Sequence, residues 1–101
     1  MRYPIDTEQY IAVMRAQIGH AEELEELFRT DVIPIMNAAY FAGKVDEPGY
    51  PKDPDAVISA FEKENGPLHD GSKRIVTAMI REENVAYAQG QQDAKDAAGA
   101  G

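Results

Sequence analysis

The stretch from Asp53 to Ile80 limits what this chain can fold into more than any other, because two amphipathic segments meet in it at Asn65-Gly66-Pro67. It opens with Asp53-Pro54-Asp55. The first aspartate can cap a helix, the proline suits its first position and the second aspartate complements the helix dipole. Gly66 then ends that helix, since glycine accepts a left-handed terminal conformation and the following proline cannot continue the helix. The pattern predicts two helices that pack as a module.

A first helix is predicted to begin near residue 7. Asp6 or Thr7 can cap it, and Asp6 with Gln9 has the spacing of a capping box. Its apolar residues recur at steps of three and four, which is typical of an amphipathic helix with one buried side. They are Tyr10, Ile11, Met14, Ile18, Ala21, Leu24, Leu27 and Phe28. Gly19 lies within this pattern and marks either a close helix crossing or a tolerated weak spot.

Pro34 is predicted to stop or kink the first helix between residues 30 and 33, because proline has no amide hydrogen and disfavours the helical conformation of the residue before it. A short second helix, with Ile35 to Phe41 on its apolar side, would then end at Gly43. A kinked continuation of the first helix is the alternative. Both interpretations stay open at this point.

The last predicted helix begins between Leu68 and Ser72 and turns apolar residues inward as far as Tyr87. Beyond that residue the sequence AQGQQDAKDAAGAG has no large apolar side chain, so its burial cannot offset the entropy of ordering it. We find no strand-like alternation of useful length and no internal repeat. Residues 1–87 are therefore expected to form one helical domain, and residues 88–101 a flexible polar tail.

These patterns together predict an all-α fold. We expect a hairpin or bundle of three to four helices with a flexible polar C-terminal tail, in which the first helix packs against the last. The residues expected to form its core are Ile18, Leu24, Phe28, Ile58, Phe61, Ile75, Met79 and Ile80.

The composition indicates a folded domain without cysteine chemistry. The chain has 101 residues, 44% of them hydrophobic, and no cysteine, so disulfides, thiolate metal sites and cysteine nucleophiles are excluded. The N-terminus lacks the apolar core of a signal peptide, and the longest apolar runs are far shorter than the roughly 20 residues that span a bilayer. We expect a location in a virion or in the host cytoplasm, and no contact with a membrane.

No pattern of residues predicts catalysis, a cofactor or a metal site. His20 and Glu23 have helical spacing, but a ferritin-like site needs further histidine and carboxylate ligands from facing helices. The acidic residues between Asp46 and Asp55 lack the ligand spacing of an EF-hand. Ser59 and Ser72 lie outside any G-x-S-x-G pattern. We therefore expect a protein that is not an enzyme and that uses no cofactor.

Charged and aromatic residues are the candidates for contacts with proteins. The candidates are Lys73, Arg74, Arg81, Glu22, Glu23, Glu26 and Tyr50. The cations would form a short basic ridge and the glutamates an acidic helix face, although the two could also pair with each other inside the molecule. Tyr50, like Tyr3 and Tyr40, either offers an exposed contact or covers the edge of the core. The formal net charge of −8 repels phosphate backbones, which disfavours nucleic acid as a partner.

Four segments carry a resemblance to a known family. They are Phe28-Arg29-Thr30-Asp31, the apolar turn Val32 to Phe41, the loop through Pro48-Gly49-Tyr50, and His69-Asp70-Gly71-Ser72-Lys73-Arg74-Ile75-Val76. Together they resemble small phage proteins encoded among podovirus head and packaging genes, which share a Phe-Gly/Ser-Thr opening, a hydrophobic helix, a variable loop and a Glu-Gly-Arg-Arg-x-Val run. This chain differs by the extra Ser72 and by lacking the glycine usual after Phe-x-Thr. The resemblance covers about residues 28–80 and implies a virion or assembly role without catalysis.

The resemblance and the patterned helices lead us to expect a non-catalytic phage virion structural or assembly protein. It would self-associate as a homo-oligomer or dock onto a larger virion component, so its partners would be phage head, portal or tail proteins or further copies of the chain. The alternative is an acidic helical inhibitor, of the anti-defence or immunity type, that binds a basic host protein through Glu22 to Glu26. Tyr50-Pro51 with residues 53–66 is faintly similar to colicin-type immunity proteins. A DNA-binding regulator that uses the basic ridge is a third hypothesis.

Overall fold

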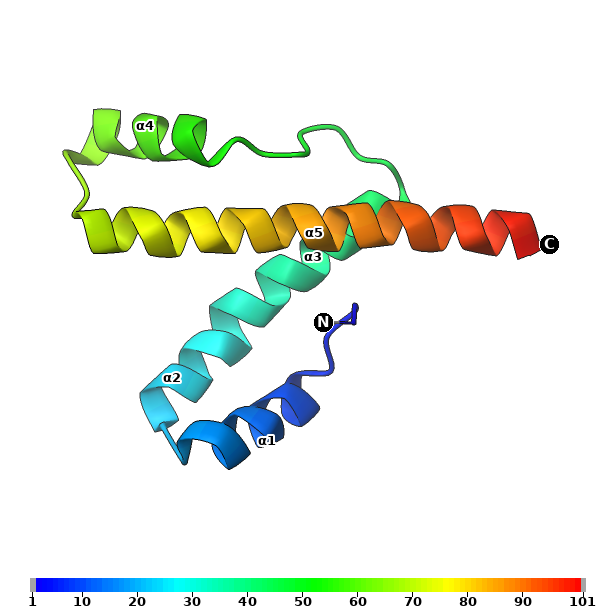
Figure 1. Cartoon of the computed structure of the whole chain (residues 1–101), viewed down its shortest axis with the longest axis horizontal. Coiled ribbons are helices and arrows are strands. Elements are labelled where there is room, and N and C mark those ends of the chain that lie inside the picture. The colour runs from blue at the N-terminus through cyan, green and yellow to red at the C-terminus, as the bar shows by residue number, and fades with distance from the viewer. Residues whose placement is uncertain (1, 101) are drawn as a thin grey trace.

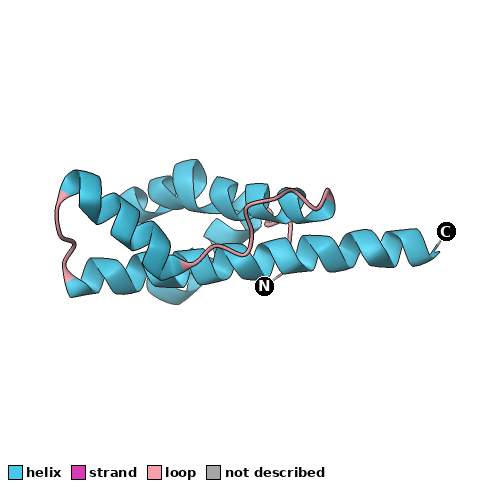
Figure 2. Cartoon of the chain, turned by 90° about the horizontal axis from the view of Figure 1, so that it is seen from above, coloured by secondary structure: helices cyan, strands magenta, loops and turns pink. Residues whose placement is uncertain are grey.

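The computed structural model describes residues 2–100, and these residues confirm the all-α prediction because they form helices and no strand (Figure 1). The elements are α1 (Thr7–Ile18), α2 (Glu22–Leu27), η1 (Phe28–Val32), α3 (Ile33–Lys44), α4 (Pro54–Asn65) and α5 (Asp70–Ala100). The π-helical turn η1 joins α2 to α3, so residues 22–44 form one continuous rod. The molecule is flat, with extents of 49 × 36 × 17 Å, and Figure 2 shows it from above.

The break in the first helical segment lies at Gly19 and not near Pro34. Asp6 caps α1 as predicted, since its carboxylate accepts a hydrogen bond from the Gln9 backbone N–H at 3.1 Å. Gly19 has a φ of +81°, which side chains rarely allow, and its N–H donates to the Arg15 carbonyl at 2.8 Å. Figure 1 shows the result, in which α1 and the α2–α3 rod are the two arms of a hairpin.

The α2–α3 rod passes through Pro34 by means of η1. The Ile33 N–H donates to the carbonyl of Phe28, five residues earlier, so the turn just before the proline is wider than an α-helical turn. In a regular α-helix the proline ring would clash with the preceding turn, and the wider turn relieves that clash. Of the two interpretations that the sequence left open at this proline, continuation of the helix is the one the structure has.

The core lies where α3 and α5 cross (Figure 1), and glycines make this crossing close. A Cβ atom added at Gly43 would overlap the carbonyl group of Tyr87, and one added at Gly90 would overlap the carbonyl group of Tyr40. The two helix backbones therefore touch, and their atoms gain dispersion contacts that side chains would prevent. The buried apolar residues are Tyr3, Ile11, Ile33, Met36, Ala39, Tyr40, Ala42, Ile58, Ile80, Ala86 and Tyr87.

The predicted core is wrong for four of its eight residues. Ile58 and Ile80 are buried, and Phe28 and Met79 are half-buried. The remaining predicted core residues, which are Ile18, Leu24, Phe61 and Ile75, are exposed. The predicted packing of the first helix against the last is also wrong, because the main contact joins α3 to α5. Small residues occupy the centre, and several large apolar side chains remain on outer faces.

The predicted domain boundary at residue 87 is wrong as well. Helix α5 continues without a break to Ala100. Within the predicted tail, Gly90 is buried in the crossing, and Asp93 accepts a hydrogen bond from the Tyr40 hydroxyl at 2.6 Å. The polar composition concealed these contacts, because a glycine that touches a backbone buries surface without an apolar side chain. Residues 94–99 continue the helix with mostly exposed side chains, and Gly101 lies outside the described residues.

The prediction of no internal repeat is wrong too. Residues 3–46 align with residues 50–93 at a constant offset of 47, without a gap. The identical pairs are Tyr3/Tyr50, Pro4/Pro51, Asp6/Asp53, Ile11/Ile58, Gly19/Gly66, Thr30/Thr77, Ile33/Ile80, Asn37/Asn84, Ala39/Ala86, Tyr40/Tyr87, Gly43/Gly90 and Asp46/Asp93. Most of these residues are turn formers, caps and small or aromatic residues, so a search for hydrophobic periodicity does not reveal them.

Equivalent residues of the two repeats have equivalent roles. Helices α1 and α4 both follow a capping aspartate, both have 12 residues, and both end at a glycine with positive φ. The Asn37 side chain accepts from the Ile5 N–H at 2.7 Å and donates to the Ile5 carbonyl at 3.0 Å. Asn84 holds the backbone of Lys52 in the same way, with both distances 2.8 Å. Each asparagine thus fastens the segment that enters a short helix to the rod of its own repeat.

The contacts between the repeats are reciprocal. Gly43 of the first repeat meets Tyr87 of the second, and the equivalent Gly90 meets the equivalent Tyr40. The Tyr40 hydroxyl also donates to Asp93 of the second repeat, and the Tyr87 hydroxyl donates to the carbonyl of Glu47, just after the first repeat. Contacts that pair i with j and j with i are those of an approximate twofold axis. The fold is therefore two αα-hairpins whose rods cross about a pseudo-twofold axis.

Replacing Gly43 or Gly90 by alanine is expected to lower the free energy of unfolding by about 2–3 kcal/mol, because the new methyl group would force the two backbones apart. Urea unfolding followed by circular dichroism measures this change. Gly71→Ala is the matched control, since a Cβ atom there meets open space, and it is expected to be neutral or stabilising by up to about 1 kcal/mol. Equal stability of the Gly43→Ala and Gly71→Ala variants would contradict the backbone contact.

Candidate interaction site

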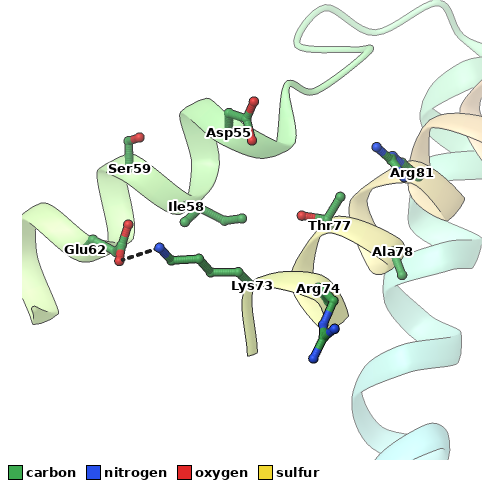
Figure 3. A pocket seen from close by; sticks show the side chains of 9 residues that line it. All are labelled: Asp55, Ile58, Ser59, Glu62, Lys73, Arg74, Thr77, Ala78 and Arg81. Carbon is green, nitrogen blue, oxygen red and sulfur yellow. Dashed lines mark ion pairs between the residues drawn. The ribbon is translucent and has the colours of Figure 1, made fainter. Parts of the chain in front are cut away.

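A groove of about 640 Å³ lies between α4 and α5 (Figure 3). We call it the α4–α5 groove. Its lining residues are Asp55, Ile58, Ser59, Glu62, Lys73, Arg74, Thr77, Ala78 and Arg81. Ile58 is only 7% exposed and provides an apolar floor, whereas charged side chains form the rim. A surface of this kind combines an apolar contact with charges that select the partner.

Glu62 holds the two walls of the groove together. Its carboxylate lies 3.7 Å from Lys73 Nζ across the groove, as the dashed line in Figure 3 shows. The same carboxylate accepts a hydrogen bond from the Leu68 backbone N–H at 2.8 Å, in the turn that joins α4 to α5. One carboxylate thereby fixes the turn and neutralises one of the three cations of the basic ridge.

The three cations of the predicted basic ridge do line this one groove. Lys73 reaches towards α4, whereas Arg74 points away from α4 in Figure 3. Arg74 and Arg81 are exposed, and neither forms an ion pair with a carboxylate of the part of the chain that the structure describes. The alternative interpretation, in which the ridge pairs with the acidic face of the first helix, is therefore not what the structure has. Two guanidinium groups remain free to bind a carboxylate or phosphate.

The groove offers ion pairs and hydrogen bonds to a bound partner. Its lining includes the hydroxyl groups of Ser59 and Thr77 but neither histidine nor cysteine. Over residues 2–100, no three histidine, cysteine or acidic side chains converge as metal ligands would.

Part of the predicted acidic face is present on α2. Glu22, Glu23 and Glu26 are exposed, and beside them Leu24 and Leu27 are 36% and 47% exposed. Ala21, two of these glutamates and both leucines line a shallow hollow. We call the three glutamates with the two leucines the acidic edge. Sequence reasoning assigned the leucines to the core, and so it missed that apolar and acidic groups share this surface.

Glu25 does not belong to the predicted acidic face, because its side chain is buried and only 1% exposed. Arg15 donates to both of its carboxylate oxygens, with the shortest distance 2.6 Å, and the Ala21 N–H donates at 3.2 Å. His20 Nδ1 lies 3.0 Å from the same carboxylate, so this histidine contacts Glu25. The hydrogen bonds from Arg15 lower the pKa of Glu25 to about 2. The cluster clamps the turn between α1 and α2.

Stability is expected to fall with acid as Glu25 is protonated. The pKa of this carboxyl is near 4.5 in the unfolded chain and about 2 in the folded chain, so its contribution is full above pH 4.5 and is lost as the pH falls towards 2. Urea unfolding at several pH values should show a smaller acid loss in Glu25→Gln than in the wild type. Glu22→Gln, at an exposed position, is the control and should retain the wild-type pH dependence. An unchanged profile in Glu25→Gln would disprove the clamp.

The candidate tyrosines are mostly part of the core. Tyr50 is half-buried and stacks on Tyr87 at 4.4 Å between ring centroids, with Lys52 Nζ 5.1 Å from its ring. Tyr3 and Tyr40 are buried and stack on each other at 6.1 Å, which is the equivalent pair of the first repeat. The prediction of exposed contacts is therefore wrong for Tyr3 and Tyr40. The alternative, that tyrosines cover the core, describes them better.

No protein-family model, curated protein or solved structure matches this chain. None of the helices described between residues 2 and 100 has both the length and the apolar character needed to cross a membrane. The repeat is the observation that the sequence could have supplied earlier, since a comparison of the chain with itself at an offset of 47 shows it.

Proposed function

We propose that this protein acts by contact and not by turnover, as a structural or assembly protein that self-associates or docks onto a larger component. The phage virion is the setting that the family resemblance implies. The observation that carries the proposal is the set of large apolar side chains that remain exposed, nearly all of them on helices. They are Val13, Ile18, Leu24, Leu27, Ile35, Phe41, Val45, Val57, Phe61, Ile75 and Val85.

So many exposed apolar side chains favour association of the protein with a partner. Fully burying one large apolar side chain contributes about 1.5–3 kcal/mol, so a partner that covers even a few of them gains a large part of a stable binding energy. Single exposed apolar residues are ordinary on a protein surface. Here, however, several continue the apolar stripes of amphipathic helices, as Leu24 and Leu27 do on α2.

The α4–α5 groove is the proposed docking surface. Arg74 and Arg81, which pair with no carboxylate among residues 2–100, provide cations, and Ile58 provides the apolar floor. A protein surface with carboxylates fits this groove better than nucleic acid does, because the chain as a whole carries 18 acidic against 10 basic residues and repels polyanions. The partners would be head, portal or tail proteins or further copies of the chain.

One observation favours a second candidate, an acidic inhibitor of a basic host protein. Glu22, Glu23 and Glu26 are exposed and make no ion pair with any described residue. An inhibitor steered by these charges would lose association rate steeply as salt is raised, whereas an assembly contact built on apolar surface would keep most of it.

Reversing one groove cation is expected to weaken docking at least about tenfold, because a repulsive contact replaces an attractive one at the rim. Arg74→Glu is the test variant, and Lys95→Glu, on an exposed position of the same helix, is the matched control. Light scattering over a concentration series measures self-association, and co-purification with coexpressed head, portal and tail proteins measures docking. A strict monomer at high concentration that co-purifies with none of them would refute the proposal.

A further inference from the structure

The two repeats carry opposite charges at equivalent positions near their hairpin turns. With the offset of 47, Arg15 corresponds to Glu62, and Glu26 corresponds to Lys73. An ion pair closes each hairpin, but its cation is on the short helix in the first repeat, where Arg15 pairs with Glu25 at 2.6 Å, and on the long helix in the second, where Lys73 pairs with Glu62 at 3.7 Å. Glu25 itself corresponds to Ser72. The backbone is repeated, whereas the charge is reversed in the pairs Arg15/Glu62 and Glu26/Lys73 and keeps its sign in the pair Glu23/Asp70.

The inversion gives the two ends of the molecule different characters. Residues 15–31 contain five acidic and two basic residues, whereas the equivalent residues 62–78 contain three of each, with Arg81 just beyond. The acidic edge lies at the first end and the α4–α5 groove at the second. Figure 1 shows α2 and α4 on opposite sides of α5, so neither surface covers the other within one molecule.

We propose that the acidic edge of one copy docks into the α4–α5 groove of a second copy. This inference rests on the self-association part of the proposed function and specifies its geometry. A contact between two acidic edges would place carboxylates against carboxylates, and a contact between two grooves would place guanidinium groups against guanidinium groups. Both contacts are repulsive, whereas an edge and a groove attract each other. The occupant of the groove is therefore a second copy of this chain, turned so that its first repeat meets the second repeat of its neighbour.

The two surfaces match in chemistry. Leu24 and Leu27, three residues apart on α2, supply the apolar centre for the groove floor at Ile58. Around them the exposed glutamates face the unpaired guanidinium groups. Arg74 and Arg81 are about 10 Å apart along α5, a span that two glutamates about 5–6 Å apart can reach through long side chains.

A contact of this kind repeats. Each molecule offers one acidic edge and one groove, and using the edge leaves the groove free for a further copy. Interfaces between two different surfaces close into rings when the rotation allows and otherwise grow as open chains. The assembly would therefore grow past the dimer as the concentration rises.

Two charge-reversal variants test the inference. The edge variant is Glu23→Lys with Glu26→Lys, and the groove variant is Arg74→Glu with Arg81→Glu; Lys73 is left alone because it pairs with Glu62. Each variant alone is expected to associate at least about tenfold more weakly than the wild type, since its two surfaces then carry the same sign. An equimolar mixture is expected to recover association, because each edge then meets a groove of opposite sign. Light scattering measures the mass, and circular dichroism confirms that both variants fold.

The outcomes separate this inference from the proposed function. If the wild type associates and both variants associate equally well, or if the mixture does not recover, then docking of edge into groove is wrong while assembly by contact stands. If the wild type stays monomeric but co-purifies with a head, portal or tail protein, the inference is likewise wrong and the proposed function stands. If it neither associates nor co-purifies, both are wrong.

Discussion

Contact between two helix backbones at Gly43 and Gly90 sets the position of everything else in the molecule. Because neither glycine has a side chain, the α2–α3 rod and α5 approach until Tyr40 and Tyr87 lie beside the opposite helix. Each short helix then packs on its own rod and carries its charges to one side of the crossing. The positions of the groove and the acidic edge relative to each other therefore depend on these two glycines. A larger residue at either glycine would change the helix crossing and with it the distance between the two surfaces.

Local signals with a stereochemical cause were predictable from the sequence. The cap at Asp53, the break at Asn65-Gly66-Pro67 and the cap at Asp6 are all where the sequence places them. Pro34 left two interpretations open, because its effect depends on whether the preceding turn can widen, and the neighbouring residues in the sequence do not reveal that. The core was misjudged because large residues were favoured, whereas the closeness of the α3–α5 crossing depends on Ala39, Ala86 and the two glycines of the crossing.

The candidate site was predictable to a similar degree. Helical spacing alone indicates that Lys73, Arg74 and Arg81 share one side of α5, and they do line one groove. Four glutamates in one short segment, however, do not reveal that Glu25 turns inward, because that depends on Arg15 across the turn. The repeat is present in the sequence itself. Its identical residues follow no hydrophobic period, however, so a search for amphipathic helices does not detect them.

The internal duplication has a consequence for how such a molecule can change over time. Two identical hairpins on separate chains form a homodimer in which every mutation appears at both ends, so the ends can never differ. Once a single gene encodes both halves, a substitution at Glu26 does not change Lys73, so a difference in charge between the two ends can be inherited. Fusion thereby converts a closed symmetric dimer into a single molecule whose two ends differ.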